Sequence, residues 1–290
     1  MRKNFWELAT VSAGFRNEIL YIHELFARKT FININGVNGH PLKFYINRDY
    51  FSRWAPQNDI TYPSIDSMLQ QLGLDSIVAR VIDGKKINQD KFFLYMETIY
   101  NLVSIITPDT KPKWTAAIID TLIQIKTNIK INCERLGFEV KKLGHWKFII
   151  AEKNAVATAV ADKYAVSELD FSSRVIEYNH FLLKGKLDRK REILLAIAQK
   201  FEEVRPQLED GNFKNVAKDA GLLLNKLNIR HNNTSPDSKG YNSFVAQMSP
   251  KELEAWYDKT YSILLLAFLA DDFPALHKEV QELKAQLETK

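Results

Sequence analysis

Apolar residues recur at steps of three and four along most of the chain, which is the spacing of one buried face of an α-helix. In the first part of the sequence this pattern predicts helices over 4–28, 64–72, 75–82 and 89–106. In the second part it predicts helices over 113–136, 154–166, 167–183, 189–208, 249–269 and 275–287, and one that starts after residue 212. Residues that commonly cap helices support five of these starts: Ser64, Asn154, Asp188, Asn212 and Ser249.

Two segments alternate between apolar and polar residues instead, which is typical of strands with one buried face. They predict a β-hairpin over 31–47 and a shorter one that joins 138–142 to 146–151. The polar, proline-containing segment 107–112 is the best candidate for a linker, and it divides the chain into domains 1–110 and 111–290. The predicted fold is mainly α. A helical N-terminal region with a small β-hairpin is followed by a helix–β-hairpin unit that leads into an antiparallel helical bundle.

Composition says more about the cellular location and the kind of partner than about the activity. The chain has 290 residues, a net charge of +5 and a pI of about 9.0, which favours an anionic partner without requiring one. Its single cysteine, Cys133, excludes an internal disulfide and lies on an apolar helix face, where we expect it to be buried. Residues 1–18 lack the apolar core of a signal peptide, and no apolar run has membrane-spanning length. We therefore expect a cytoplasmic protein that does not associate with a membrane.

Motifs that hold nucleotides, metals or catalytic serines are missing from the sequence. The phosphate-binding GxxxxGK[ST], the dinucleotide-binding GxGxxG, the metal-binding HExxH and the nucleophile elbow GxSxG do not occur. The six histidines lie too far apart in sequence to form a local pair of metal ligands. We expect neither a cofactor nor a metal.

One stretch concentrates polar residues at the end of an apolar helix pattern: DAGLLLNKLNIRHNN, residues 219–233. If the helix continues, His231 falls beside Leu224 and Leu227 on the apolar face. Asparagine is a poor helix former, because its amide competes for backbone hydrogen bonds. Yet three asparagines would line the neighbouring stripe: Asn225, Asn228 and Asn232.

These residue types suit a ribonuclease that works without a metal. His231 could act as the general acid or base, and Arg230 could stabilise the negative charge that develops on the phosphate. Asn225 or Asn232 could orient the phosphate. Adjacent residues on a regular helix point about 100° apart, so Arg230 and His231 converge only if the helix unwinds or a dimer interface joins two copies. The alternative is a helix end with a histidine packed in the core.

Two further constellations could bind phosphate or bases. Arg16 and His23 lie on one face of the first predicted helix, two turns apart, where a phosphate could bridge them. The alternative is that the Arg16 side chain snorkels to solvent while His23 packs in the core. Arg48, Arg53 and Trp54 lie in an aromatic segment that could stack single-stranded nucleic acid. The alternative for this segment is aromatic packing beneath an irregular loop.

Three sequence blocks resemble a group of bacterial abortive-infection (Abi) phage-resistance proteins. They are ERLGFEV with AEKNAVATAVAD, then VIEYNHFLLKGKLDRKREILLAIAQKFE, and LLLNKLNIRHNN with MSPKELEAWYDKTYSILLLAFL, within residues 113–270. The resemblance implies antiphage defence and a C-terminal bundle of the HEPN type, whose members are commonly dimeric, metal-independent endoribonucleases. Their motif places an arginine several residues before the histidine, but the residue six positions before His231 is Asn225.

The resemblance thus implies His231, Arg230, Asn225 and Asn232 as the residues that act on RNA, and a phage-derived trigger of unknown identity. The alternative function is a non-catalytic interaction module that binds nucleic acid or protein. We also expect a homodimer through the C-terminal bundle, because two apolar groups exceed what one bundle needs. They are the aromatic cluster Trp256, Tyr257 and Tyr261, and the residues Leu276, Val280, Leu283 and Leu287, spaced alternately by four and three.

Overall fold

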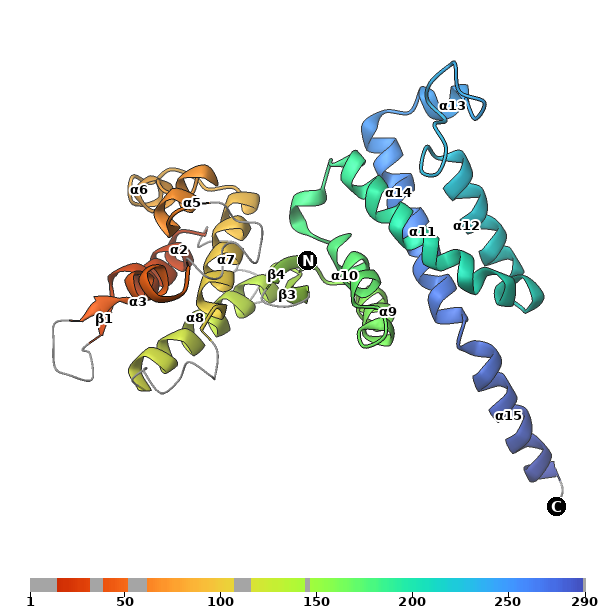
Figure 1. Cartoon of the computed structure of the whole chain (residues 1–290), viewed down its shortest axis with the longest axis horizontal. Coiled ribbons are helices and arrows are strands. Elements are labelled where there is room, and N and C mark those ends of the chain that lie inside the picture. The colour runs from red at the N-terminus through yellow and green to blue at the C-terminus, as the bar shows by residue number, and fades with distance from the viewer. Residues whose placement is uncertain (1–14, 32–38, 52–61, 107–115, 144–146, 289–290) are drawn as a thin grey trace, which may run out of the picture. The chain divides into compact units, whose positions relative to one another are not determined.

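The computed structural model describes residues 15–31, 39–51, 62–106, 116–143 and 147–288, and it confirms a mainly helical fold with two small β-hairpins (Figure 1). Contacts divide the chain into two compact units, Met1–Lys153 and Asn154–Lys290. The sequence suggested a division at residue 110 instead. The later position has a physical reason, since the helix and hairpin that follow residue 110 pack against helix α7 (Gln89–Ser104).

In the first unit, short helices surround α7, which carries ten buried residues. Cys133 of the predicted long helix is fully buried, as expected, and burial raises the pKa of its thiol to about 12. The predicted linker at 107–112 and the start of the first predicted helix lie outside the described residues. The helical elements of this unit, besides α7, are α2 (Arg16–His23), η1 (Glu24–Arg28), α3 (Leu42–Ile46), η2 (Asn47–Phe51), α5 (Ile65–Gln71), α6 (Ile77–Ile82) and α8 (Ala116–Arg135).

The first hairpin is much smaller than its sequence predicts. Its described strands, β1 (Thr30–Phe31) and β2 (His40–Pro41), are antiparallel, and the segment LKFYI that follows is helical rather than extended. Pro41 occupies the N-cap of α3, and Leu42, Tyr45 and Ile46 are buried at helical spacing. The prediction of a strand over this segment was wrong. Five residues of mixed polarity fit the two-residue repeat of a strand as well as the 3.6-residue repeat of a helix.

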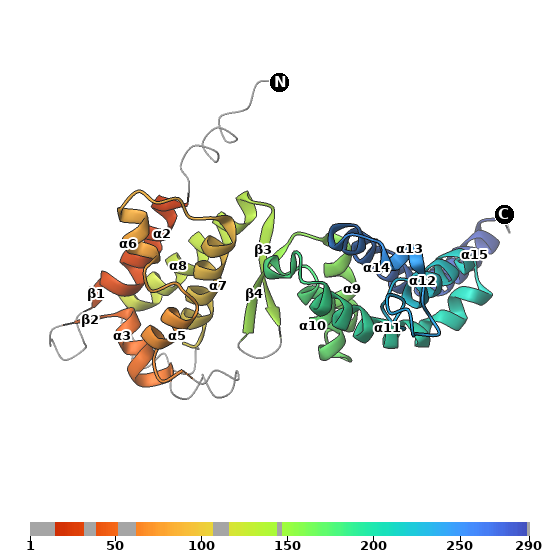
Figure 2. The ribbon, with the colours of Figure 1, turned by 90° about the horizontal axis from the view of Figure 1, so that it is seen from above.

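The second hairpin is confirmed, and its strands lie side by side in both views of the ribbon (Figures 1 and 2). Strand β3 (Phe138–Leu143) pairs antiparallel with β4 (Lys147–Glu152). Side chains of α7 complete the outer edge of β4. The Asn101 amide donates to the Phe148 carbonyl over 2.7 Å and accepts from its N–H over 2.8 Å, and Glu97 accepts from Ile150 N–H over 2.6 Å. These bonds satisfy backbone groups that an edge strand would otherwise expose.

The second unit consists of helices joined by loops. Helices α11, α12 and α14 pack on one another, and α12 turns back along α11 (Figure 1). Large side chains of these helices are buried: Phe201 of α11 is fully enclosed, and Phe268 of α14 contacts the rings of Tyr164 on α9 and Phe171 on α10. The elements are α9 (Ala155–Tyr164), α10 (Leu169–Glu177), η4 (Phe181–Leu183), α11 (Leu187–Asp210), α12 (Lys214–Lys226), α13 (Ser243–Ala246), α14 (Pro250–Ala270) and α15 (Phe273–Glu288).

The predicted helix caps are confirmed at three of five positions. Ser64 and Asn154 each accept a hydrogen bond from the third residue of their helix, and Ser249 forms a full capping box with Glu252. The other two predictions were wrong: α11 already begins before Asp188, whose carboxylate lies in the first turn, and α12 begins after Phe213. A first-turn carboxylate still stabilises the positive end of the helix dipole.

Candidate functional site

The polar stretch 219–233 does not continue as a helix. Helix α12 ends at Lys226, and Asn228 adopts a left-handed backbone conformation with φ of 57°. Asparagine tolerates this region better than other residues with a Cβ. The Arg230 N–H then closes the turn by donating to the Leu224 carbonyl over 3.0 Å. The sharp turn places the residues that follow in a loop rather than on the apolar helix face.

Two asparagines hold this loop closed. Asn228 N–H donates to Asn233 Oδ1 over 2.8 Å, and Asn233 N–H donates to Asn228 Oδ1 over 3.1 Å. Asn233 is 1% exposed, and its Nδ2 donates to the Gly240 carbonyl over 2.6 Å. Its own carbonyl accepts from Asn242 N–H over 2.9 Å. We call this reciprocal pair, Asn228 and Asn233, the asparagine clasp.

The remaining polar side chains of the stretch also serve the local structure. Asn232 Oδ1 accepts hydrogen bonds from Thr234 N–H over 3.2 Å and from Ser235 N–H over 3.0 Å. Arg230 Nη2 forms an ion pair with Glu202 of α11 and donates to the Ala198 carbonyl over 3.4 Å. Asn228, Asn232 and Asn233 therefore attach the loop to itself, and Arg230 attaches it to α11.

His231 is exposed, which overturns its predicted place beside Leu224 and Leu227 on the apolar face. Those two leucines are buried, but the helix stops before His231 and the turn at Asn228 carries the histidine to the surface. Asn225 remains on α12 and is half-buried. The structure thus leaves His231 accessible, while the guanidinium of Arg230 is engaged by Glu202.

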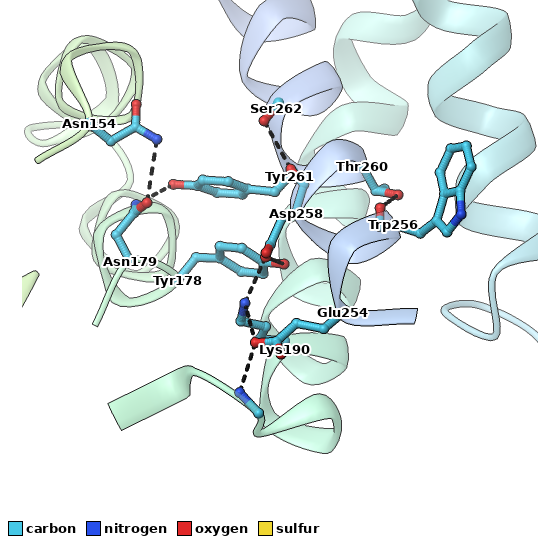
Figure 3. A network of polar contacts seen from close by, with 11 residues as sticks. Asn154, Tyr178, Asn179, Lys190, Glu254, Trp256, Asp258, Thr260, Tyr261 and Ser262 are labelled. Carbon is cyan, nitrogen blue, oxygen red and sulfur yellow. Dashed lines mark hydrogen bonds and ion pairs between the residues drawn. The ribbon is translucent and has the colours of Figure 1, made fainter. Parts of the chain in front are cut away.

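A second polar cluster, which sequence reasoning missed, joins α10, α11 and α14 (Figure 3). Lys190, only 6% exposed, forms ion pairs with Glu254 Oε1 over 2.9 Å and with Asp258 Oδ1 over 2.7 Å. The Tyr178 hydroxyl donates to the same Asp258 oxygen over 3.0 Å, and the ammonium lies 5.2 Å from the centre of the Tyr178 ring. We call these four residues the Lys190 network. The sequence signal was a pair of carboxylates four residues apart on one helix, facing a lysine within an apolar pattern.

Aromatic and amide contacts extend the Lys190 network into the core. The Tyr178 ring stacks on Tyr261 with centroids 4.1 Å apart. The Tyr261 hydroxyl donates to the Val175 carbonyl over 2.6 Å and accepts from Asn179 Nδ2 over 2.8 Å. Tyr257 and Tyr261 are both buried, which overturns their predicted role as an exposed dimer surface.

Protonation states within the Lys190 network follow from burial and pairing. Burial raises the pKa of Tyr178, and the neighbouring Asp258 carboxylate raises it further, so this hydroxyl stays protonated. Burial alone would raise the pKa of Glu254, but the hydrogen bonds from Lys190 and from Gly185 N–H outweigh it and hold the pKa below its ordinary value. One ammonium thus bridges two carboxylates from α14, and the arrangement is suited to holding three helices in register.

The outer face of α14 and α15 carries an uncovered row of apolar side chains. None of the described residues of α15 is buried, and this helix extends beyond α11 and α12 (Figure 1). The exposed fractions run from 36% for Phe273 to 68% for Leu287. We call this row the apolar seam; its members are Leu266, Leu269, Phe273, Leu276, Val280, Leu283 and Leu287.

The residues predicted to stack single-stranded nucleic acid belong to the first unit. The Arg48 guanidinium donates to both carboxylate oxygens of Asp49, and Tyr45 and Phe51 beside it are buried, so these two rings cannot stack on bases. Arg53 and Trp54 lie outside the described residues.

Arg16 and His23 begin and end α2. His23 lies 3.4 Å from the Tyr95 hydroxyl, and burial lowers its pKa, whereas Arg16 is exposed. His23 thus packs against Tyr95, as the second interpretation describes.

Within the described residues, no group of three or more histidine, cysteine, aspartate or glutamate side chains could hold a metal ion, and no helix is long and apolar enough to cross a membrane. Comparison with protein-family models, curated proteins and solved structures finds no match to this chain.

Proposed function

We propose that the protein acts in antiphage defence by abortive infection as a helical interaction module, whose apolar seam binds a protein partner. The single observation that carries the binding role is the apolar seam itself, a continuous exposed row on α14 and α15. Exposed apolar surface of this extent is typical of interaction sites. The defence role is supported by the resemblance of residues 113–270 to abortive-infection proteins.

The local chemistry favours binding over catalysis within one chain. Two of the three asparagines that suggested a phosphate site have local partners: Asn228 belongs to the asparagine clasp, and Asn232 closes the turn that follows it. Arg230 is held by Glu202, so a phosphate would have to compete with a carboxylate for the same guanidinium. A histidine alone supplies proton transfer but no stabilisation of the developing charge.

The test compares two leucines with equal exposure. Leu276 on the seam and Leu222 on α12 are both 57% exposed, so a change to glutamate costs similarly little in folding at either place. Bacteria that express wild type, Leu276→Glu or Leu222→Glu would be challenged with a phage panel, and plaques would be counted. We expect Leu276→Glu to lose protection and Leu222→Glu to keep it. Equal protection by both variants would refute the binding role of the seam.

RNA cleavage through His231 is the second candidate, and the exposure of this side chain on a hydrogen-bonded loop favours it. A histidine that acts on RNA must be reachable by a phosphodiester, whereas a core histidine is not. Bulk RNA would be followed after induction of wild type and His231→Ala in infected cells. Cleavage that disappears in a folded His231→Ala protein supports this candidate, and cleavage that persists removes His231 from it.

A further inference from the structure

We infer that the partner of the apolar seam is a second copy of this chain, which pairs with it as a parallel, in-register, two-stranded coiled coil. This inference rests on the proposed binding role of the seam and names the partner and its orientation. The argument uses the spacing of the seam, the types of residue at its core positions, and the charges beside it.

The spacing of the seam is that of a heptad repeat. Its seven residues follow one another at steps of three, four, three, four, three and four, although two turn residues, Asp271 and Asp272, separate α14 from α15. If Leu266 is position a, the a positions are 266, 273, 280 and 287 and the d positions are 269, 276 and 283. Three heptads of apolar a and d positions define a coiled-coil seam.

The junction between the two helices preserves this face. Pro274 falls at position b, away from the seam, and in the first turn of α15, where its missing N–H leaves few hydrogen bonds unmade. The Leu276 N–H already donates to the Asp272 carbonyl over 3.3 Å, so helical hydrogen bonding resumes at once. The seam therefore covers 22 positions, and its part on α15, residues 273–287, is about 22 Å long at 1.5 Å per residue.

The core residues favour two strands. The central layer has the β-branched Val280 at a, between leucines at d, Leu276 and Leu283. This combination favours dimers over larger coiled coils when the helices are parallel. A helix of sixteen residues with no fully buried side chain is marginal in water, even with Phe273 packed on Phe213, so pairing would also supply stability that α15 lacks.

The flanking charges select the parallel orientation. Glu279 is at position g and Lys284 is at position e of the next heptad, which face each other across a parallel dimer. Both are exposed, and no ion pair within the described part of the chain engages either of them. Asp272 and His277 repeat the same acid-to-base relation one heptad earlier, although Asp272 also pairs with Lys163 over 2.7 Å.

The antiparallel orientation brings like charges together. In that arrangement position g faces g and position e faces e, so with Leu269 opposite Leu287 the two Glu279 side chains would oppose one another, and so would the two His277 side chains. Like charges at such positions disfavour a pairing. A second copy in parallel orientation buries the apolar seam and places opposite charges next to each other beside it.

Engineered cysteines distinguish the orientations, because the single native thiol does not interfere. Cys133 is fully buried and its pKa is raised to about 12, so little reactive thiolate forms. Under mild oxidation, Leu287→Cys should form a covalent dimer, because in-register parallel helices place the two residues side by side. In an antiparallel pair residue 287 lies about 27 Å from its counterpart, opposite residue 269 of the other copy.

Wild-type protein is the control for oxidation and should remain uncrosslinked. A disulfide between Leu269→Cys and Leu287→Cys chains in a mixture, with none for Leu287→Cys alone, would overturn the parallel arrangement. Sedimentation of the wild type as a monomer at tens of micromolar would overturn pairing with a second copy. We expect a dimer that Leu276→Glu weakens at least about a hundredfold and that Leu222→Glu leaves unchanged.

Charge exchange tests the contact between Glu279 and Lys284. Glu279→Lys and Lys284→Glu should each weaken self-association by about tenfold, because each creates two repulsive pairs per dimer. A mixture of the two variants should recover the affinity of the wild type, since every pair is then attractive. Self-association that is unaffected by either single change would overturn the assigned contact.

The outcomes separate this inference from the proposed function. If Leu276→Glu loses phage protection while the wild type is a monomer, the seam binds another protein and only the self-pairing fails. If the wild type dimerises through the seam but Leu276→Glu protects fully, the proposed function fails and the dimer remains.

Discussion

The loop that follows α12 and the apolar seam on α14 and α15 differ in how their side chains are satisfied. The loop is polar, yet it is closed by hydrogen bonds between its own residues, above all in the asparagine clasp. The apolar seam consists of residues that gain most from burial, yet it is left open. The comparison teaches that a concentration of polar residues need not be a site, whereas an uncovered apolar face within the described structure needs a partner.

The physical reason is that a polar group without a hydrogen bond and an apolar group left in water cost different amounts of free energy. A buried amide without a partner costs about 1–3 kcal/mol, so a folded loop must pair its polar groups internally. Apolar surface costs about 25 cal/mol for each Å² left in water, a cost that a second molecule can remove later. Changes in the polar interior should therefore alter folding, while changes on the seam should alter association.

The largest effect is expected from Lys190→Ala. Removal of the ammonium leaves Glu254 and Asp258 without their shared counter-charge, next to the buried Tyr178. We expect a loss of about 3–5 kcal/mol in the free energy of unfolding. Denaturation in urea would measure it.

Lys278→Ala is the matched control, because this lysine side chain is 80% exposed and should change stability little. Acidification provides a second check. The pKa of Glu254 is lowered on folding, so its contribution is present above its unfolded pKa and lost as the pH falls through its folded pKa. The stability difference between wild type and Glu254→Gln should shrink accordingly. A constant difference down to acid pH would contradict the assigned pairing.

Asn233→Ala should have the next largest effect. The change removes the acceptor for Asn228 N–H and the donor to the Gly240 carbonyl, at a position that is 1% exposed. We expect a loss of about 2–4 kcal/mol. Thermal unfolding would show it, and the exposed Asn232→Ala should lose clearly less. Equal losses would mean that the clasp does not hold the loop.

Asn228 separates backbone conformation from side-chain bonding. Asn228→Gly loses the Oδ1 acceptor but keeps easy access to a φ of 57°, whereas Asn228→Ala loses both. We expect alanine to be less stable than glycine by about 1 kcal/mol. The two variants would be compared by chemical denaturation, and a more stable alanine variant would exclude the left-handed turn.

Leu283→Gln is expected to leave folding in dilute solution within about 0.5 kcal/mol of wild type, since the side chain is 55% exposed and both residues favour helix. It should, however, remove any dependence of the melting temperature on protein concentration. Calorimetry over a hundredfold concentration range would measure both. A large loss at high dilution would show that the seam is part of the fold of one chain.

The smallest effect on stability is expected from His231→Ala. The side chain is exposed, so its removal creates no cavity, and the change should stay within about 0.5 kcal/mol. A loss above about 2 kcal/mol would indicate that His231 is buried after all, as the continuous-helix interpretation required.

Much of the architecture could be predicted from local patterns. The long helices, the second hairpin, the caps at Asn154 and Ser249 and the burial of Cys133 follow from periodicity and capping chemistry, which act over a few residues. Prediction failed where a short segment fitted two periods, as in LKFYI. It also failed at His231, because one left-handed residue, Asn228, changes the direction of the chain and moves every later side chain to a new face.

The candidate sites also divide into features set by residue order and features set by the packing of helices. The sequence by itself determined the heptad spacing of the seam and its flanking charges, since these depend only on residue order along a helix. Only the tertiary structure decided that Arg230 meets Glu202, 28 residues away, that Lys190 meets Asp258, 68 residues away, and that the seam stays uncovered. The physical reason is that burial and ion pairing depend on which helix packs against which, and that is set by the chain as a whole.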